Sequence, residues 1–211
     1  KQTYGTTSIE LLESIGFFDG PTIGAHVVWP TEDEIGILAE RRVGVIHNPT
    51  SNMKISSGVS PVVEMLNAGV LVGLGTDGAA SNNDLDMFES MRFASLLHKL
   101  HERDSRAVSA KASLAMATIG GARGIGLGDE VGSLEAGKRA DLVVVSMAAP
   151  RQTPLYDPVS HLVYTTRGDD VRMTIVHGRI LMRDGRVLTL DETMILEEAR
   201  QLAMKVSDAV H

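Results

Sequence analysis

"VLVGLGTDGAASNNDLDMF", residues 70–88, gives the clearest indication of the fold class. It begins with an apolar run at 70–74, passes through small and polar residues around Asp77, and continues with a helical pattern from Asp84. A short run that is apolar on both faces is typical of a strand in a parallel sheet with helices outside. Because chemistry in such folds lies at the carboxyl ends of strands, Asp77 is a candidate functional residue.

Two further strand and helix units precede this stretch. Residues 22–28 and 43–47 read as buried strands, and Thr31 with Glu34 forms a capping-box pattern that opens a helix over 31–40. We therefore expect an α/β fold over residues 1–125. Three units are too few to close a (β/α)8 barrel, so a barrel and an open doubly wound sheet both remain open at this point.

The character of the sequence changes after Gly120 and Gly121, and we expect a domain boundary at residues 125–126. Residues 126–190 are rich in turns and short strands, with strands expected at 142–145, 171–176 and 179–182. A final helix is expected over residues 191–211. This pattern predicts a small β-rich domain followed by a terminal helix.

Composition restricts the function classes. The 211-residue chain has a formal net charge of −7 and no run rich in Lys or Arg, which argues against nucleic acid as a partner. No apolar run reaches membrane-spanning length and no signal peptide opens the chain, so we expect a cytoplasmic protein without a membrane partner. The chain contains no cysteine, so any metal ligands must be His, Asp or Glu.

Polar residues follow each expected strand. His26, His47 with Asn48, and Asp77 lie at the three strand ends. Each could simply make local hydrogen bonds. His26 and Asp77, two strands apart, would converge if the sheet closes, and that suits a hydrolytic metal site. However, Asp77 alone cannot hold a catalytic zinc, which uses about three protein ligands, and the chain has no H-x-H motif.

Two other patterns are weaker. His98 and His101 lie one turn apart on a helix and could mimic a metal pair, but the charged residues around them predict exposure to solvent. The glycines at 73, 75 and 78 match G-x-G-x-x-G formally. The match spans the strand instead of following it, so we reject dinucleotide binding.

Four segments together resemble the amidohydrolase superfamily: AHVVWPTEDEI, HNPTSNMKISSG, GLGTDGAASNNDLDMFESMR and GSLEAGKRADLVVV. The resemblance covers essentially the whole chain and is strongest to the branch of 5-methylthioadenosine/S-adenosylhomocysteine deaminases and triazine hydrolases. It implies the C-terminal part of a (β/α)8 TIM-type barrel, strands 6 to 8, over residues 1–125. It also implies part of a composite β-sandwich over 126–190 and a C-terminal helix over 191–211.

The resemblance also implies site residues. His26 would be the strand 6 histidine that steers the attacking water, and Asp77 the strand 8 aspartate that ligates the metal and accepts a proton. One divalent metal ion is implied, zinc before iron or manganese, and it is expected to be absent from the chain alone. Further polar residues on the two loops above the barrel mouth are expected to contact substrate: Asn48, Ser51, Asn52, Ser81 and Asn82, with Asn83 beside them.

The implied activity is hydrolytic deamination of a small adenosine-type purine. The H-x-H pair, a third metal His and a proton-handling Glu would come from a missing N-terminal half or a second chain, and the whole is expected to be a homo-oligomer. One alternative is an s-triazine or guanine amino- or chlorohydrolase. Another is an inactive fragment that lacks the strand 1 and strand 5 ligands, and a third is a doubly wound nucleotide-binding domain.

Overall fold

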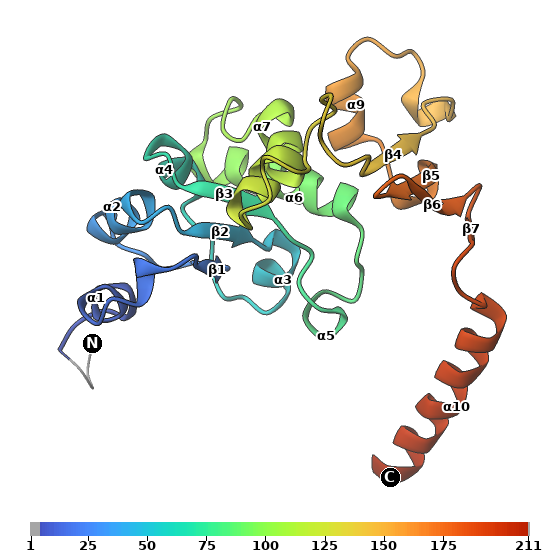
Figure 1. Ribbon diagram of the computed structural model, residues 1–211, viewed down its shortest axis with the longest axis horizontal. Helices are drawn as coiled ribbons and strands as arrows, with labels where there is room; N and C mark the ends of the chain where they lie inside the picture. Colours follow the sequence, from blue (N-terminus) through green and yellow to red (C-terminus); the bar gives the residue numbers. More distant parts are fainter. Residues whose placement is uncertain (1–4, 211) are drawn as a thin grey trace. The chain divides into compact units, whose positions relative to one another are not determined.

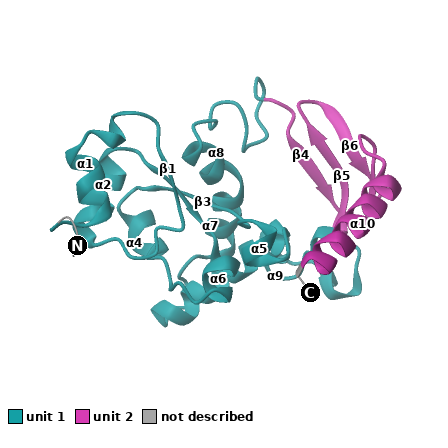
Figure 2. Cartoon of the chain, turned by 90° about the horizontal axis from the view of Figure 1, so that it is seen from below, with its two compact units in different colours: residues 1–138, 147–168 teal, residues 139–146, 169–211 magenta. Residues whose placement is uncertain are grey.

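The computed structural model describes residues 5–210, which form two compact units (Figure 2). The first unit contains residues 5–138 and Met147–Gly168, and the second contains Arg139–Ser146 and residues 169–210. The first unit has a parallel sheet with helices, and the second has an antiparallel sheet with one long helix. The α/β class predicted from the sequence is therefore confirmed.

The first unit is built on a three-stranded parallel sheet. Its strands are β1 (Ile23–Ala25), β2 (Gly44–His47) and β3 (Leu71–Leu74), in the spatial order β1-β2-β3 (Figure 1). Ala25 pairs with Ile46, and His47 pairs with Leu74, so the three carboxyl ends lie at one edge of the sheet. This edge is where the sequence places its polar residues.

Helices connect and cover the strands. The capping box predicted for α2 (Glu32–Glu40) is confirmed: the Glu34 backbone N–H donates to Thr31 Oγ1, and Thr31 N–H donates to Glu34 Oε2 at 2.7 Å. The other helical segments of the first unit are α1 (Ser8–Ser14), η1 (Phe17–Asp19), α3 (Pro49–Lys54), α4 (Val62–Asn67), α5 (Ala79–Asn82), α6 (Met87–Glu102), α7 (Ala110–Ala115), η2 (Met116–Gly120), α8 (Gly121–Gly124), η3 (Pro150–Gln152) and α9 (Pro158–Tyr164).

One face of the sheet carries the apolar core. Val45 on β2 and Val72 on β3 are buried there, together with Met65 from α4 and Met91 from α6. Burial of these apolar side chains is the main force that holds the helices on this face.

The opposite face approaches a helix through glycines instead of side chains. A Cβ on Gly44 would overlap the carbonyl oxygen of Gly124 and lie 2.6 Å from its carbonyl carbon. A Cβ on Gly73 would lie 2.7 Å from the Cα of Gly121. The segment that contains η2 and α8 therefore sits directly on the backbone of β2 and β3, a contact that only residues without side chains permit.

A histidine pair lies in the core between β2 and α6. His47 and His98 are both fully buried, with Nε2 atoms 3.3 Å apart and ring centroids 5.1 Å apart. The expectation that His98 is exposed was wrong, whereas His101 is exposed as predicted. Within the described residues, neither Nδ1 atom has a hydrogen-bond partner. Burial, followed by the charge repulsion of neighbouring imidazoles, lowers the pKa of His47 to about 3 and that of His98 to about 4.

These depressed pKa values predict a protein that loses stability in mild acid. As the pH falls through the ordinary pKa of 6.5, the unfolded chain binds protons on both histidines while the folded chain does not. The free energy of unfolding therefore rises with pH from about 3 to 6.5 for His47 and from about 4 to 6.5 for His98. Between pH 7 and pH 5 each histidine should lower it by about 2 kcal/mol. Equilibrium urea unfolding at both pH values measures this difference.

The double variant His47→Leu/His98→Leu removes both titrating rings and should be less sensitive to pH by about 4 kcal/mol over the same interval. His101→Gln is the matched control, because that histidine is exposed on the same helix and should leave the pH dependence unchanged. Equal pH dependence in the double variant and the wild type would contradict the assignment.

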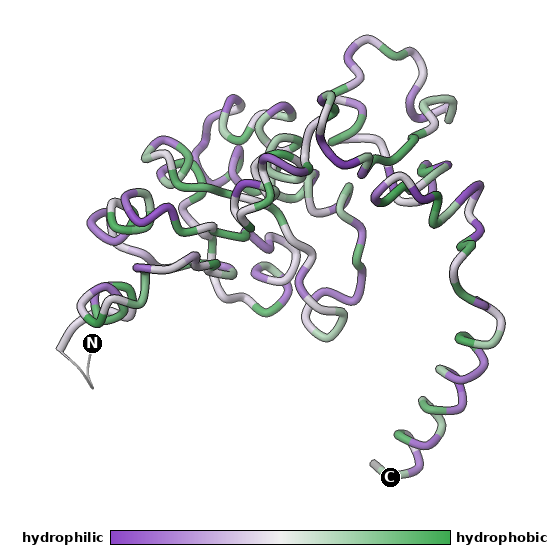
Figure 3. Tube along the Cα trace, in the orientation of Figure 1, coloured by the Kyte–Doolittle hydropathy of each residue, from purple (hydrophilic) through white to green (hydrophobic). Residues whose placement is uncertain are grey.

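The second unit is a four-stranded antiparallel sheet followed by a helix. The strands β4 (Leu142–Val145), β5 (Val171–Val176), β6 (Arg179–Arg183) and β7 (Arg186–Val187) are paired in chain order, and η4 (Gly168–Asp170) leads into β5. The helix α10 (Glu192–Val210) alternates hydrophobic and hydrophilic residues (Figure 3). Across residues 5–210, no helix is both long and apolar enough to cross a membrane.

Candidate active site

The carboxyl edge of the parallel sheet gathers three strand ends. His26 follows β1, Asn48 follows β2, and Asp77 lies three residues beyond β3. The backbone N–H of His26 donates to Ile46 O at 2.9 Å, and the backbone N–H of Gly75 donates to the backbone oxygen of His47 at 2.9 Å. These hydrogen bonds extend the strand pairing past the regular strands and keep the three ends level.

The two candidate residues both adopt a backbone conformation that is unusual for residues other than glycine. His26 has φ of 68° and Asp77 has φ of 60°. The left-handed region costs about 1–2 kcal/mol for most residues and persists where the surrounding structure enforces it. Both residues therefore leave the extended strand conformation at the same edge of the sheet.

Asp77 is held as a carboxylate by two hydroxyl groups. Ser81 Oγ on α5 donates to Asp77 Oδ2 at 2.6 Å, and Ser51 Oγ on α3 donates to the same oxygen at 2.7 Å. The Ser81 and Ser51 hydroxyls, followed by the backbone N–H of Gly78, lower the pKa of Asp77 to about 2. The side chain is therefore ionised at any physiological pH, and it is 32% exposed.

His26 faces this carboxylate. Its Nε2 lies 3.7 Å from Asp77 Oδ2, and its ring is 34% exposed. Its Nδ1 lies 2.7 Å from Oδ1 of Asn52 on α3. The structure thus brings together the two residues that the sequence placed first, and it leaves both reachable from outside.

The other sequence-predicted residues lie around this pair in different environments. Asn48 donates to Ile46 O at 3.1 Å, Asn82 donates to Thr76 O at 2.7 Å, and both side chains are buried. Ser51 and Asn52 are fully buried, and Ser81 is half-buried. Asn83 is exposed, and its Oδ1 accepts a hydrogen bond from Lys54 Nζ. Their contact with substrate stays a prediction.

The donor set fits one corner of a metal site. Asp77 supplies an ionised oxygen ligand, which zinc and other divalent metals accept, and His26 supplies an imidazole directed at it. Within residues 5–210, however, no three His, Asp or Glu side chains are grouped closely enough to hold a metal ion. Any metal bound at this edge would therefore need ligands beyond these two.

Sequence reasoning missed the helix that supports the site. From the sequence, Asn48, Ser51 and Asn52 are expected on a loop, yet residues 49–54 form α3 with Pro49 at its first position. Proline at the first helical position was the available signal. The order of Ser51 and Asn52 on this helix places one side chain on Asp77 and the next on His26.

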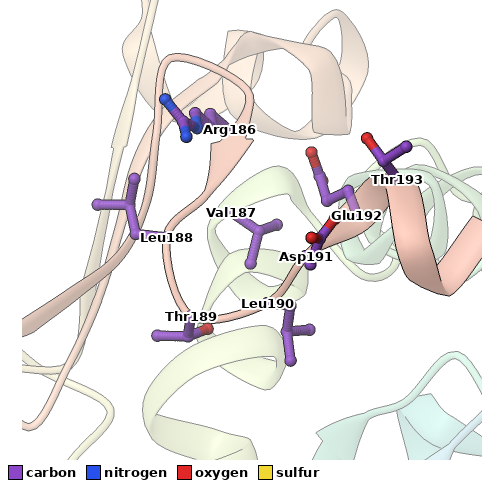
Figure 4. Close-up of a pocket in the computed structure, with 8 residues that line it drawn as sticks. All are labelled: Arg186, Val187, Leu188, Thr189, Leu190, Asp191, Glu192 and Thr193. Atoms are coloured by element: carbon purple, nitrogen blue, oxygen red, sulfur yellow. The ribbon is translucent and has the colours of Figure 1, made fainter.

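A pocket elsewhere in the chain does not belong to this site. It is lined by eight consecutive residues, 186–193, between β7 and the start of α10 (Figure 4). It contains neither His26 nor Asp77. We assign no function to it.

Solved structures of known proteins match the chain closely. An adenosine deaminase from Xanthomonas campestris with bound zinc has a TM-score of 0.94 and 37% sequence identity, covering 98% of this chain and 47% of that chain. Atrazine chlorohydrolase from Arthrobacter aurescens, complexed with zinc, has a TM-score of 0.86 and 29% identity, covering 95% of this chain and 45% of that one.

Curated relatives have similar sequences. The 5'-deoxyadenosine deaminase of Methanosarcina acetivorans is 51% identical over 203 residues, which are 96% of this chain and 46% of the relative. The 5-methylthioadenosine/S-adenosylhomocysteine deaminase of Desulforudis audaxviator is 50% identical over 210 residues, 100% of this chain and 49% of the relative. The chain thus spans about half the length of these relatives.

The resemblance inferred from the motifs is confirmed by these relatives and by a family model. The model described as "Amidohydrolase family" matches residues 1–181, most of the chain, and this match includes both His26 and Asp77. The chain belongs to the amidohydrolase family.

Proposed function

We propose that this chain forms part of a metal-dependent aminohydrolase that replaces the amino group of an adenosine-type purine with oxygen. The observation that carries the proposal is the ionised Asp77 carboxylate facing His26 at the carboxyl edge of a parallel sheet. The names of the similar proteins, which are deaminases of 5'-deoxyadenosine, methylthioadenosine and S-adenosylhomocysteine, support the choice of substrate class.

We also propose the architecture of the complete protein. In it β1, β2 and β3 are strands 6, 7 and 8 of a (β/α)8 barrel, residues 126–190 contribute to a composite β-sandwich, and α10 is the terminal helix. Among the described residues β1 has a strand partner on one side only, and its Ile23 is 54% exposed. An apolar residue on an unpaired strand edge is expected where further strands join.

A zinc ion is the metal that this site would hold, with Asp77 as one ligand and the remaining ligands outside the described residues. Zinc would lower the pKa of a water molecule toward neutrality. Iron or manganese in its place stays open to measurement. The chain alone, with a single carboxylate and imidazole, is proposed to bind no catalytic metal.

The residues of this chain have distinct roles in the proposed reaction. Water adds to the ring carbon that bears the amino group, and ammonia leaves as the carbonyl forms. The Asp77 carboxylate accepts the proton of the attacking water, and His26 orients that water through Nε2. The group that protonates the purine ring would come from the part of the enzyme outside this chain.

A substrate panel tests the proposal. The complete polypeptide, verified by intact mass, is assayed for ammonia release from 5'-deoxyadenosine, methylthioadenosine, S-adenosylhomocysteine, adenosine and guanine, and for release of ammonia or chloride from a chlorinated s-triazine. We expect turnover of the adenosine-type compounds together with bound zinc. Turnover of only guanine or the triazine would select the alternative within the family. A zinc-loaded protein with no turnover of any compound would contradict the proposal.

Two further expectations accompany the proposal. Exposed apolar residues on α10 support self-association; the Leu202 side chain, for example, is 62% exposed. Light scattering measures the mass of the associated species. A homo-oligomer and a cytoplasmic location both stay predictions from the sequence.

A further inference from the structure

Two adjacent residues of α3 each hold one of the two candidate catalytic groups. Ser51 Oγ donates to Asp77 Oδ2 at 2.7 Å, and Asn52 Oδ1 lies 2.7 Å from His26 Nδ1. Both contacts join residues 26 positions apart in the sequence, so each ties α3 to a neighbouring strand end. One short helix therefore contacts both sides of the site.

Burial indicates what these residues do. Ser51 and Asn52 both have 0% of their surface exposed, whereas His26 and Asp77 are about one third exposed. A residue that contacts substrate must present polar atoms to the cleft, and these two present them only to the catalytic pair. Their contact with substrate, expected from the sequence, is therefore the weaker explanation of this geometry.

We propose that Ser51 and Asn52 are positioning residues that fix the carboxylate of Asp77 and the imidazole of His26 relative to each other. The proposal rests on the proposed function, since it assigns these residues a part in the same reaction. They act through His26 and Asp77 and do not touch substrate.

The serine fixes the carboxylate. Its hydroxyl bonds only Oδ2 of Asp77, the oxygen that also lies 3.7 Å from His26 Nε2. Ser81 on α5 donates to the same oxygen, so Oδ2 accepts hydrogen bonds from both α3 and α5. A carboxylate held by donors on two elements cannot rotate freely, which keeps its reacting orientation.

The asparagine fixes the imidazole. With Oδ1 as acceptor, a neutral His26 ring carries its proton on Nδ1, which leaves Nε2, 3.7 Å from Asp77 Oδ2, as a hydrogen-bond acceptor. An attacking water beside the two groups would then donate to Nε2. Among the described residues, the Nδ2 of Asn52 is buried without a hydrogen-bond partner, so the oxygen is the half of this amide that the site uses.

Helix α3 is internally hydrogen-bonded and packed against other helices. The Asn52 N–H donates to Asn48 O at 3.0 Å, and the Ser57 N–H donates to Asn52 O at 3.0 Å. Helix α3 also contacts α5 and α6. A rigid support of this kind is required if hydrogen bonds are to transmit position to catalytic groups.

The experiment compares four variants of the complete polypeptide in steady-state deamination of 5'-deoxyadenosine. Ser51→Ala removes the hydroxyl, Asn52→Leu removes the acceptor at similar size, and Asn52→Asp keeps an oxygen acceptor. Ser60→Ala is the matched control, because Ser60 is also fully buried and donates at 2.8 Å to Val27 O without touching Asp77 or His26. Asn52→Ala replaces Asn52→Leu if the latter does not fold.

Ser51→Ala and Asn52→Leu should each lower kcat by about 10- to 100-fold, with KM within about twofold of wild type. Asn52→Asp should restore most of the lost kcat, and Ser60→Ala should keep the wild-type kcat. The proposal is overturned if both loss variants match Ser60→Ala, or if they raise KM at constant kcat. A wild type without turnover of any purine would instead overturn the proposed function, and the positioning role with it.

Discussion

Replacing Asp77 by Asn in the complete polypeptide should lower kcat for adenosine-type substrates by about 10²- to 10⁴-fold. Asparagine has nearly the same shape but cannot be ionised, so it can neither accept the proton of the attacking water nor offer a charged metal ligand. The amide oxygen can still accept hydrogen bonds from the hydroxyls of Ser51 and Ser81. The fold should survive, and the loss should be chemical.

Steady-state kinetics with zinc analysis and circular dichroism separates these effects. Asp84→Asn is the matched control, since Asp84 lies in the same segment, is exposed, and accepts only a local hydrogen bond from the Asp86 N–H. It should keep kcat within about twofold of wild type. A fully active Asp77→Asn variant with normal zinc content would remove Asp77 from the site.

Replacing Gly44 by Ala should destabilise the first unit by at least about 3 kcal/mol, or prevent folding. The added methyl would overlap Gly124 O, and the surroundings cannot yield easily. Gly44 is buried in β2, pairs with strands on both sides, and donates its N–H to Thr22 O at 3.0 Å. Any movement away from Gly124 would break this pairing.

The matched control is the same substitution in open space. A Cβ on Gly36, in the middle of α2, meets no atom within 4 Å. Gly36→Ala should stabilise the protein by up to about 1 kcal/mol, because alanine favours helix. Urea unfolding measures both variants. A Gly44→Ala variant within about 0.5 kcal/mol of wild type would show that the glycine contact between β2 and α8 is not tight.

Much of the first unit could be predicted because local rules agree with the packing. The apolar runs at 43–47 and 70–74 became β2 and β3, and the Thr31 capping box opens α2. The apolar runs alone, without the family resemblance, indicate that His26 and Asp77 follow strands of one sheet. These features depend on hydrogen bonds and burial within a few residues, which the sequence displays directly.

Other features depend on contacts that are remote in sequence. The burial of His98 follows from a stripe on α6 shared with Met91, Ala94 and Ser95, at helical spacing. The charged residues near His98 predict exposure and so obscure this stripe in the sequence. The left-handed backbone at His26 and Asp77 has only a weak signal in residue type, because His and Asp adopt it more often than most residues but only where the surrounding loops impose it.

The most direct test of the account is an anomalous difference map, recorded at the zinc absorption edge, from crystals of the complete polypeptide. We expect a peak about 2.0–2.2 Å from a carboxylate oxygen of Asp77, with His26 beside it and the remaining ligands from outside this chain. A peak bound elsewhere, with Asp77 and His26 free of metal, would contradict it.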